Sequence, residues 1–255
     1  MEKSIVVPWD FTEKAEASFQ HALILSEIMA REIVLFHVIG KENQKEEAKS
    51  KLEADVNRLH TTYGTKPLFT CRIGDIYKSI NEFSEEISSP IVVMPLHNSK
   101  RAIKVIIGST IPFYLVQYPP KSKKITDIVV PIDHYEENRV QLNWVIFLAK
   151  VFNSNINIIK PFINSNAKNK LMKKNIFFAK QLMDNKKVVY GVRTAKREVK
   201  FNLAISNFTK EIDADLIFMM TYNFKDFMAI AEKENSTAPL LCLNPRSVKI
   251  VPDKY

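Results

Sequence analysis

Apolar residues in this chain fall into short runs separated by longer amphipathic segments. Five runs in the first half have the length and β-branched content of strands buried on both faces, at 4–9, 32–39, 68–73, 90–96 and 112–118. Between them, apolar residues recur at helical spacing, which predicts helices over 10–28, 41–64, 76–87 and 99–106. Because strands and helices alternate, we predict an α/β fold with a mostly parallel, doubly wound sheet and right-handed crossovers.

The same pattern occurs twice. IVVPWD at 5–10 returns as IVVPID at 128–133, so that Pro8 matches Pro131 and Asp10 matches Asp133. Further on, SPIVVMPLHN matches ADLIFMMTYN, and GSTIPFYLVQYP matches NSTAPLLCLNP. Since the matches keep their order, we predict two copies of one unit, with domain 1 over 1–122 and domain 2 over 123–255.

Composition narrows the functional classes. A chain of 255 residues with 46% hydrophobic and 25% charged residues is ordinary for a globular protein of two domains. No apolar run is long enough for a membrane span, and we expect no signal peptide. Cys71 and Cys242 lie far apart in apolar runs, so we expect buried, reduced thiols and a cytoplasmic location.

Glycine is scarce, with five residues and no close pair. A dinucleotide-binding fingerprint, a P-loop and a nucleophile elbow each need clustered glycines. The sequence therefore excludes all three. It also offers no metal-ligand spacing and no group of residues suited to nucleophilic or acid–base catalysis, so we predict neither an enzyme nor a metal site.

Several segments together carry a resemblance. IVVPWDF and IVVPIDH open the two halves, IVLFHVI forms the second strand, RIGDIYKSI follows the third, and DADLIFMMT forms the fourth. In this order they resemble the universal stress protein (UspA-like) family in its tandem, two-domain form, over nearly the whole chain. The resemblance implies two adenine nucleotide alpha hydrolase-like domains, each a five-stranded sheet flanked by helices. It also implies that the domains pair through their last strands as a pseudo-dimer.

Nucleotide-binding members of that family hold phosphates with a Gly, two residues, a second Gly, nine residues, and Gly-Ser or Gly-Thr. By spacing, these positions here are Pro95, Asn98, Gly108 and Ser109. In the family, however, a whole helix follows the Gly-Ser, and here only two residues precede the strand that starts at 112. The helix must therefore end at Gly108, where a left-handed backbone favours glycine.

The second half supports this interpretation. Its residue in the place of Gly108 is Asn235, and asparagine also tolerates the left-handed conformation. A helix C-cap accounts for both residues, whereas a phosphate loop does not account for asparagine. We therefore interpret the phosphate loop as degenerate in both repeats and expect no cofactor.

The alternative is an ATP- or AMP-binding protein that uses domain 1 only. The resemblance would then place the nucleotide on Pro8, Asp10, Val38, Met94, His97, Gly108 and Ser109. The simpler interpretation of Asp10 and Asp133 is helix capping, because each has a glutamate three residues later. In the second half, Pro161 replaces Val38, which weakens a paired site. We take His97 as an ordinary loop residue.

Charge is uneven along the chain. The formal net charge is +9, and most of the excess lies in KNKLMKKNIFFAKQLMDNKK and RTAKREVK of the second half. The first segment reads as an amphipathic helix with Leu171, Phe178 and Leu182 toward the core and lysines in solvent. The alternative is a surface for nucleic acid or an acidic membrane, although no nucleic-acid-binding motif is present.

These observations predict a non-enzymatic, cytoplasmic, universal stress protein-like protein. We expect a stress-response role that is regulatory or based on ligand binding. The expected partners are the two domains for each other, an unknown protein, and possible further copies of the chain.

Overall fold

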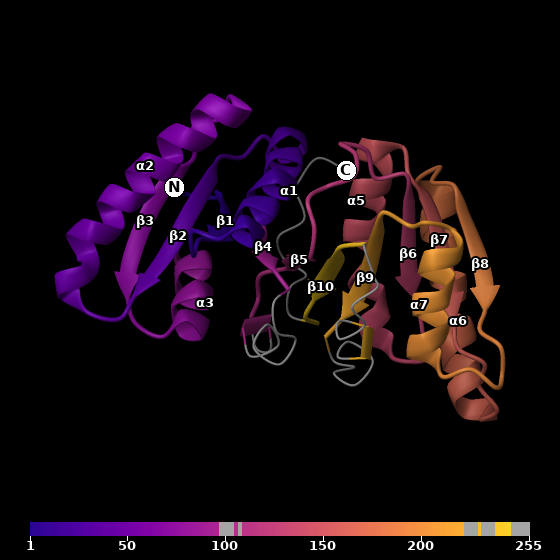
Figure 1. Ribbon diagram of the computed structural model, residues 1–255. Helices are drawn as coiled ribbons and strands as arrows, with labels where there is room; N and C mark the ends of the chain where they lie inside the picture. Colours follow the sequence, from indigo (N-terminus) through magenta and orange to yellow (C-terminus); the bar gives the residue numbers. More distant parts are fainter. Residues whose placement is uncertain (97–104, 107–108, 222–228, 231–237, 246–255) are drawn as a thin grey trace. The chain divides into compact units, whose positions relative to one another are not determined.

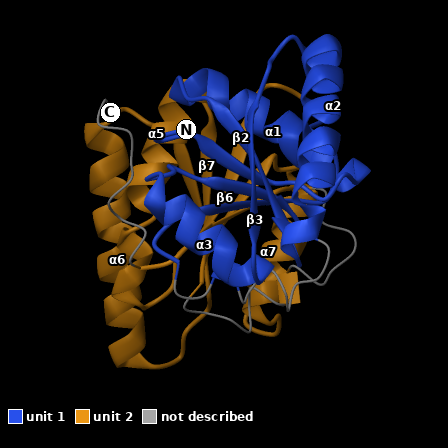
Figure 2. Ribbon diagram, turned by 90° about the vertical axis from the view of Figure 1, so that its left-hand side faces the viewer, with its two compact units in different colours: residues 1–121 blue, residues 122–255 orange. Residues whose placement is uncertain are grey.

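The computed structural model describes residues 1–96, 105–106, 109–221, 229–230 and 238–245. The chain divides into two compact units, unit 1 over Met1–Lys121 and unit 2 over Ser122–Tyr255, which Figure 2 shows in different colours. Each unit is described by itself below.

Unit 1 alternates strands and helices as the hydrophobic pattern predicts (Figure 1). Its elements are β1 (Ile5–Pro8), α1 (Glu13–Met29), β2 (Ile33–Ile39), the 3₁₀ turn η1 (Glu42–Gln44), α2 (Lys45–Tyr63), β3 (Leu68–Ile73), α3 (Ile76–Glu86), β4 (Val92–Pro95) and β5 (Phe113–Val116). The strands lie in the order β3-β2-β1-β4-β5, and every pair is parallel. This doubly wound order confirms the predicted fold class.

Unit 2 repeats the arrangement. Its elements are β6 (Asp127–Pro131), the 3₁₀ turn η2 (Glu136–Arg139), α5 (Leu142–Phe152), β7 (Asn155–Lys160), α6 (Asn166–Asn185), β8 (Tyr190–Thr194), α7 (Phe201–Glu211), β9 (Leu216–Met220) and β10 (Leu240–Leu243). Its strand order is β8-β7-β6-β9-β10, again with parallel pairs only. The second half therefore has the topology of the first.

The central strands are buried on both faces, which explains their continuous apolar sequences. In unit 1, all four residues of β1 are buried, and Phe36 of β2 stacks on Phe83 of α3 with ring centroids 4.5 Å apart. In unit 2, Trp144 and Phe147 of α5 are buried and meet edge to face, with centroids 5.9 Å apart. None of the described helices is both long and apolar enough to cross a membrane.

β3 of unit 1 and β8 of unit 2, each at one edge of its own sheet, carry the same side-chain arrangement. In unit 1, Arg72 of β3 lies over the ring of Phe83, 4.9 Å from its centroid, and forms a 2.7 Å ion pair with Glu86. In unit 2 the corresponding residues are Arg193, Phe208 and Glu211, at 4.2 Å and 2.6 Å. The repeat therefore extends from topology to individual side chains.

Candidate functional site

The carboxyl edge of the unit 1 sheet is where doubly wound folds bind ligands. The strand register places three of the candidate residues there. Pro8 pairs with Phe36, and Val6 pairs with Val92, so Pro8 lies level with Met94 on β4. Val38 lies two residues further toward the carboxyl edge than Phe36 and is half-buried. The structure thus brings Pro8, Val38 and Met94 to one edge.

Asp10 lies at the same edge and is exposed. Its Oδ1 atom accepts hydrogen bonds from the Thr12 backbone N–H at 3.2 Å and from the Thr12 hydroxyl at 2.6 Å. Thr12 in turn is the N-cap of α1, and its Oγ1 accepts from the Ala15 N–H at 3.3 Å. The prediction that Asp10 caps this helix is therefore wrong. Asp10 orients the cap instead, because Thr12 lies closer to the first turn.

The turn between Asp10 and Thr12 is held by β2. Phe11 has a φ of 65°, a left-handed conformation that is uncommon for a bulky residue. Its ring meets His37 edge to face, with centroids 4.8 Å apart. His37 Nδ1 lies 2.6 Å from the Trp9 carbonyl oxygen. Because a carbonyl oxygen can only accept, His37 carries its proton on Nδ1.

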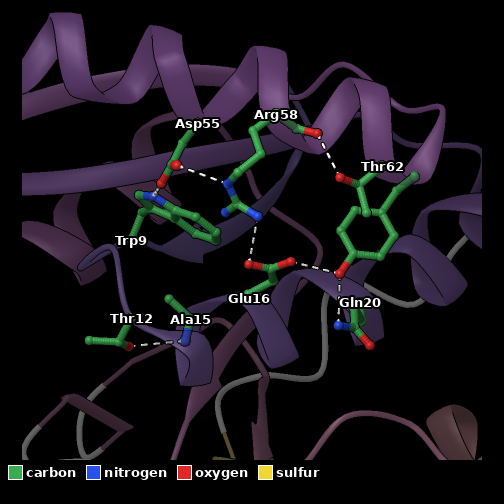
Figure 3. A network of polar contacts seen from close by, with 9 residues as sticks. Trp9, Thr12, Ala15, Glu16, Gln20, Asp55, Arg58 and Thr62 are labelled. Atoms are coloured by element: carbon green, nitrogen blue, oxygen red, sulfur yellow. Dashed lines mark hydrogen bonds and ion pairs between the residues drawn. The ribbon is translucent and has the colours of Figure 1, made fainter.

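A network of polar contacts fixes the residue before Asp10 (Figure 3). Trp9 Nε1 donates to Asp55 of α2 at 2.8 Å, and Asp55 accepts from Arg58 at 3.2 Å. Arg58 also pairs with Glu16 of α1 at 2.8 Å, and Glu16 accepts from the Tyr63 hydroxyl at 2.7 Å. These contacts join α1 and α2 on one face of the unit 1 sheet. They also fix the position of Trp9, the residue that precedes Asp10.

Ser109 lies at the opposite edge of the sheet. It comes just before β5, and β5 starts beside Val92, the first residue of β4. Its neighbour Thr110 donates through its hydroxyl to Glu85 at 3.0 Å, in the last turn of α3. Since α3 returns from the carboxyl to the amino edge, Ser109 is separated from Asp10 by the length of the strands, on the order of 13 Å for four residues. The structure therefore does not bring Ser109 together with Asp10 and Val38.

The polar groups of Ser109 are turned toward the protein. The side chain is 1% exposed. The backbone N–H donates to the Ile106 carbonyl at 3.1 Å, the hydroxyl donates to the Ile111 carbonyl at 3.3 Å and accepts from the Ile111 N–H at 3.1 Å. Val105 and Ile106 are helical, so this serine follows a helix. Two other candidates, His97 and Gly108, lie outside the described residues, as does most of the helix predicted over 99–106.

At the equivalent edge of unit 2, the described polar side chains form hydrogen bonds with one another and with the backbone. Asp133 is 8% exposed and accepts from the Tyr135 N–H at 2.9 Å and from Asn138 Nδ2 at 2.5 Å. Asn175 of α6 donates to the carbonyl oxygens of Asp133 at 3.0 Å and Tyr135 at 2.8 Å. Its Oδ1 accepts from Arg139 at 3.0 Å. We call Asp133, Tyr135, Asn138, Arg139 and Asn175 the unit 2 polar cluster.

Asp133 is also not the N-cap that the sequence predicts. The N-cap of η2 is Tyr135, and α5 begins only at Leu142. The 3₁₀ turn occupies the place where α1 begins in unit 1. This extra turn is the physical reason that Asp133 becomes buried, whereas Asp10 stays exposed.

Sequence reasoning missed Asn175 and Asn138. Both are buried, at 1% and 3% exposure. The sequence does contain a signal for Asn175, because this residue lies between Met172 and Ile176 on the buried side of a helix. A polar residue on an apolar face usually has buried partners. No group of acidic, histidine or cysteine side chains in the described ranges is arranged to hold a metal ion.

Comparisons with known proteins agree with this fold. No protein-family model matches the chain. A universal stress protein of Methanocaldococcus jannaschii is 24% identical over 139 residues, which cover 43% of this chain and 85% of that protein. The structure of a universal stress protein from Archaeoglobus fulgidus DSM 4304 has a TM-score of 0.75 at 15% identity, covering 94% of this chain and 96% of that one. A protein of unknown function from Pseudomonas aeruginosa PAO1 has a TM-score of 0.66 at 10% identity, covering 97% and 94%.

Proposed function

Because the chain is UspA-like, with the universal stress protein fold in two consecutive copies, we propose that it is a non-enzymatic binding or regulatory protein whose phosphate loop is degenerate in both repeats. Its role is then stress-linked regulation through a protein partner or a small ligand, without nucleotide hydrolysis.

The position of Ser109 carries this proposal. A phosphate loop needs unpaired backbone N–H groups that point at the ligand, next to the residues that hold the rest of the nucleotide. The N–H of Ser109 is paired with Ile106, the side chain is buried, and Asp10 lies at the other edge of the sheet. A nucleotide held by Asp10 and Val38 could not reach Ser109 with its phosphates without refolding the segment before β5.

The unit 2 polar cluster supports the same proposal for the second repeat. Asp133 is turned inward to Asn138, and the adjoining backbone carbonyls accept from Asn175. A nucleotide at this edge would have to displace these buried hydrogen bonds, and leaving buried polar groups unpaired costs about 1–3 kcal/mol each.

A second candidate, an ATP- or AMP-binding protein that uses domain 1, rests on one observation. Pro8, Asp10, Val38 and Met94 share the carboxyl edge of unit 1. These residues could hold an adenosine, but the described residues at this edge include no phosphate cradle.

Calorimetric titration of the nucleotide-stripped protein with adenosine, AMP, ADP and ATP separates the two candidates. We expect no saturable heat at millimolar ligand, and no difference between the parent and Asp10→Ala or Ser109→Ala. Thr110→Ala, which changes the neighbouring hydroxyl, serves as the matched control for Ser109→Ala. Micromolar binding of ATP that both Asp10→Ala and Ser109→Ala abolish would contradict the proposal. Equal affinity for adenosine and ATP, lost only in Asp10→Ala, would favour the second candidate without phosphate contacts.

We extend the proposal to location and assembly. Cys71 and Cys242 form no disulfide; Cys242 is buried as predicted, whereas Cys71 is only half-buried. Burial raises the pKa of the Cys242 thiol well above its usual value. Such an unreactive thiol suits a reducing cytoplasm. Pairing of the two domains through their last strands, and assembly of further copies, remain predictions from the family resemblance.

A further inference from the structure

The exposed side of α6 differs from the exposed side of its counterpart in unit 1. Both helices follow the second strand of their unit, with 19 residues in α2 and 20 in α6. α2 carries four lysine or arginine residues and four acidic residues, interspersed along its length. Three of its lysines pair with glutamates three or four residues away, counting Glu42 of η1, at 2.6–3.0 Å. The surface of α2 is therefore neutralised locally.

The surface of α6 is not neutralised. It carries one acidic residue, Asp184 near its end, and five exposed lysines, which are Lys168, Lys170, Lys173, Lys174 and Lys180. Among the described residues, none of these lysines forms an ion pair. Near the start of the helix, burial and the charge of Lys173 lower the pKa of Lys160. Like charges are thus gathered here with no described carboxylate paired to them.

Large apolar side chains are exposed among these lysines. Phe177 is 62% exposed, Phe178 40% and Leu171 39%, whereas α2 exposes no large apolar side chain. Phe177 lies three or four residues from Lys173, Lys174 and Lys180, so helical geometry surrounds its ring with ammonium groups. The prediction that Leu171, Phe178 and Leu182 face the core is therefore wrong, since the first two are exposed and Leu182 is only half-buried. The buried side consists of Met172, Asn175, Ile176, Ala179 and Met183.

This combination identifies the chemistry of a partner. Lysines attract an anionic surface, and each basic residue near an acidic bilayer adds about 1 kcal/mol, or roughly a fivefold gain in affinity. Exposed phenylalanine and leucine gain from transfer into the interface of a bilayer. The bases of a nucleic acid would stack on the phenylalanines, but a nucleic acid has no apolar phase into which the aliphatic side chain of Leu171 could transfer. The mixture of aromatic, aliphatic and cationic side chains therefore favours a lipid surface.

We propose that the exposed side of α6 docks on a bilayer that contains acidic lipids, with Lys170, Lys173, Lys174 and Lys180 at the headgroups and Phe177 inserted between them. The docking holds the protein at the membrane surface without a membrane-spanning segment. It does not depend on whether unit 1 binds a nucleotide.

Sedimentation of the full chain with vesicles tests this docking. We expect binding to vesicles of phosphatidylcholine with phosphatidylserine, no binding to phosphatidylcholine alone, and a steep loss of binding as salt is added. The variant Lys170→Glu/Lys174→Glu should bind at least about 20-fold more weakly, from two basic contacts at about fivefold each. The control Lys49→Glu/Lys51→Glu changes the net charge equally on α2 and should bind within about threefold of the parent.

Insertion of residue 177 has its own readout. In Phe177→Trp, the emission of the new tryptophan should shift to shorter wavelength on acidic vesicles, and Phe177→Ser should weaken binding severalfold. Equal binding to neutral vesicles, or an equal loss in the α2 control, would overturn the proposal. Binding to a single-stranded RNA but not to acidic vesicles would also overturn it and would assign the surface to nucleic acid. Circular dichroism confirms that each variant is folded.

Discussion

Replacing Asn175 by leucine should destabilise unit 2 by about 2–4 kcal/mol. Leucine has a similar volume but neither donates nor accepts. The substitution removes the bonds to the Asp133 and Tyr135 carbonyls and leaves Arg139 without its 3.0 Å acceptor. Buried polar groups that lose their partners cost about 1–3 kcal/mol each. The Tyr135 carbonyl keeps its bond from Asn138, which limits the total.

Urea denaturation followed by circular dichroism measures this loss. The matched control is Gln181→Ala, an exposed polar residue on the same helix, which should change the free energy of unfolding by less than about 0.5 kcal/mol. An Asn175→Leu protein as stable as the parent would show that the unit 2 polar cluster adds no stability, and the proposal that a nucleotide must displace these bonds would lose its support.

Acidification should destabilise unit 1 through His21. This residue of α1 is buried, its Nε2 lies 3.0 Å from the Tyr118 carbonyl, and its ring is 5.6 Å from Tyr114. Burial lowers the pKa of His21 to about 4, against 6.5 when the chain is unfolded, and the bond to the carbonyl only partly opposes this. Above pH 6.5, His21 is neutral in both the folded and the unfolded state, so it causes no loss of stability. As the pH falls from 6.5 to 4, the unfolded state takes up the proton first, so stability is lost, by about 2 kcal/mol at pH 5.

His21→Gln isolates this contribution, since glutamine keeps a donor for Tyr118 and does not titrate. Its free energy of unfolding should change about 2 kcal/mol less than that of the parent between pH 7.5 and pH 5. His60→Gln, an exposed histidine in the last turn of α2, should retain the pH dependence of the parent. If His21→Gln and the parent lost stability equally on acidification, His21 would not be the group responsible.

Much of the fold could be predicted because the spacing of apolar residues agrees with the strands and helices that form. Strands buried on both faces, such as β1, give continuous apolar runs, and the helices show clear periodicity. The distance from Ser109 to the last strand was enough to question the phosphate loop. The spatial reason, that Ser109 lies at the amino edge, came only from the register of β4 and β5.

Other features depend on tertiary contacts that a sequence does not display. The N-cap is Thr12, whereas the sequence predicts Asp10, because two side chains with oxygen acceptors compete within one short turn. The core side of α6 was misassigned because that helix carries two apolar stripes, and the buried Asn175 lies within the true one. The burial of Met172, Ile176 and Met183 shows which stripe faces the core.

A nuclear magnetic resonance titration of the ¹⁵N-labelled full chain with ATP, observing the Ser109 amide, tests directly whether domain 1 lacks a phosphate loop. We predict that this amide does not shift at millimolar ATP, because its N–H stays bonded to Ile106. A saturable shift of the Ser109 amide together with that of Asp10 would show that one nucleotide contacts both residues. The proposed loss of the phosphate loop would then be wrong for domain 1.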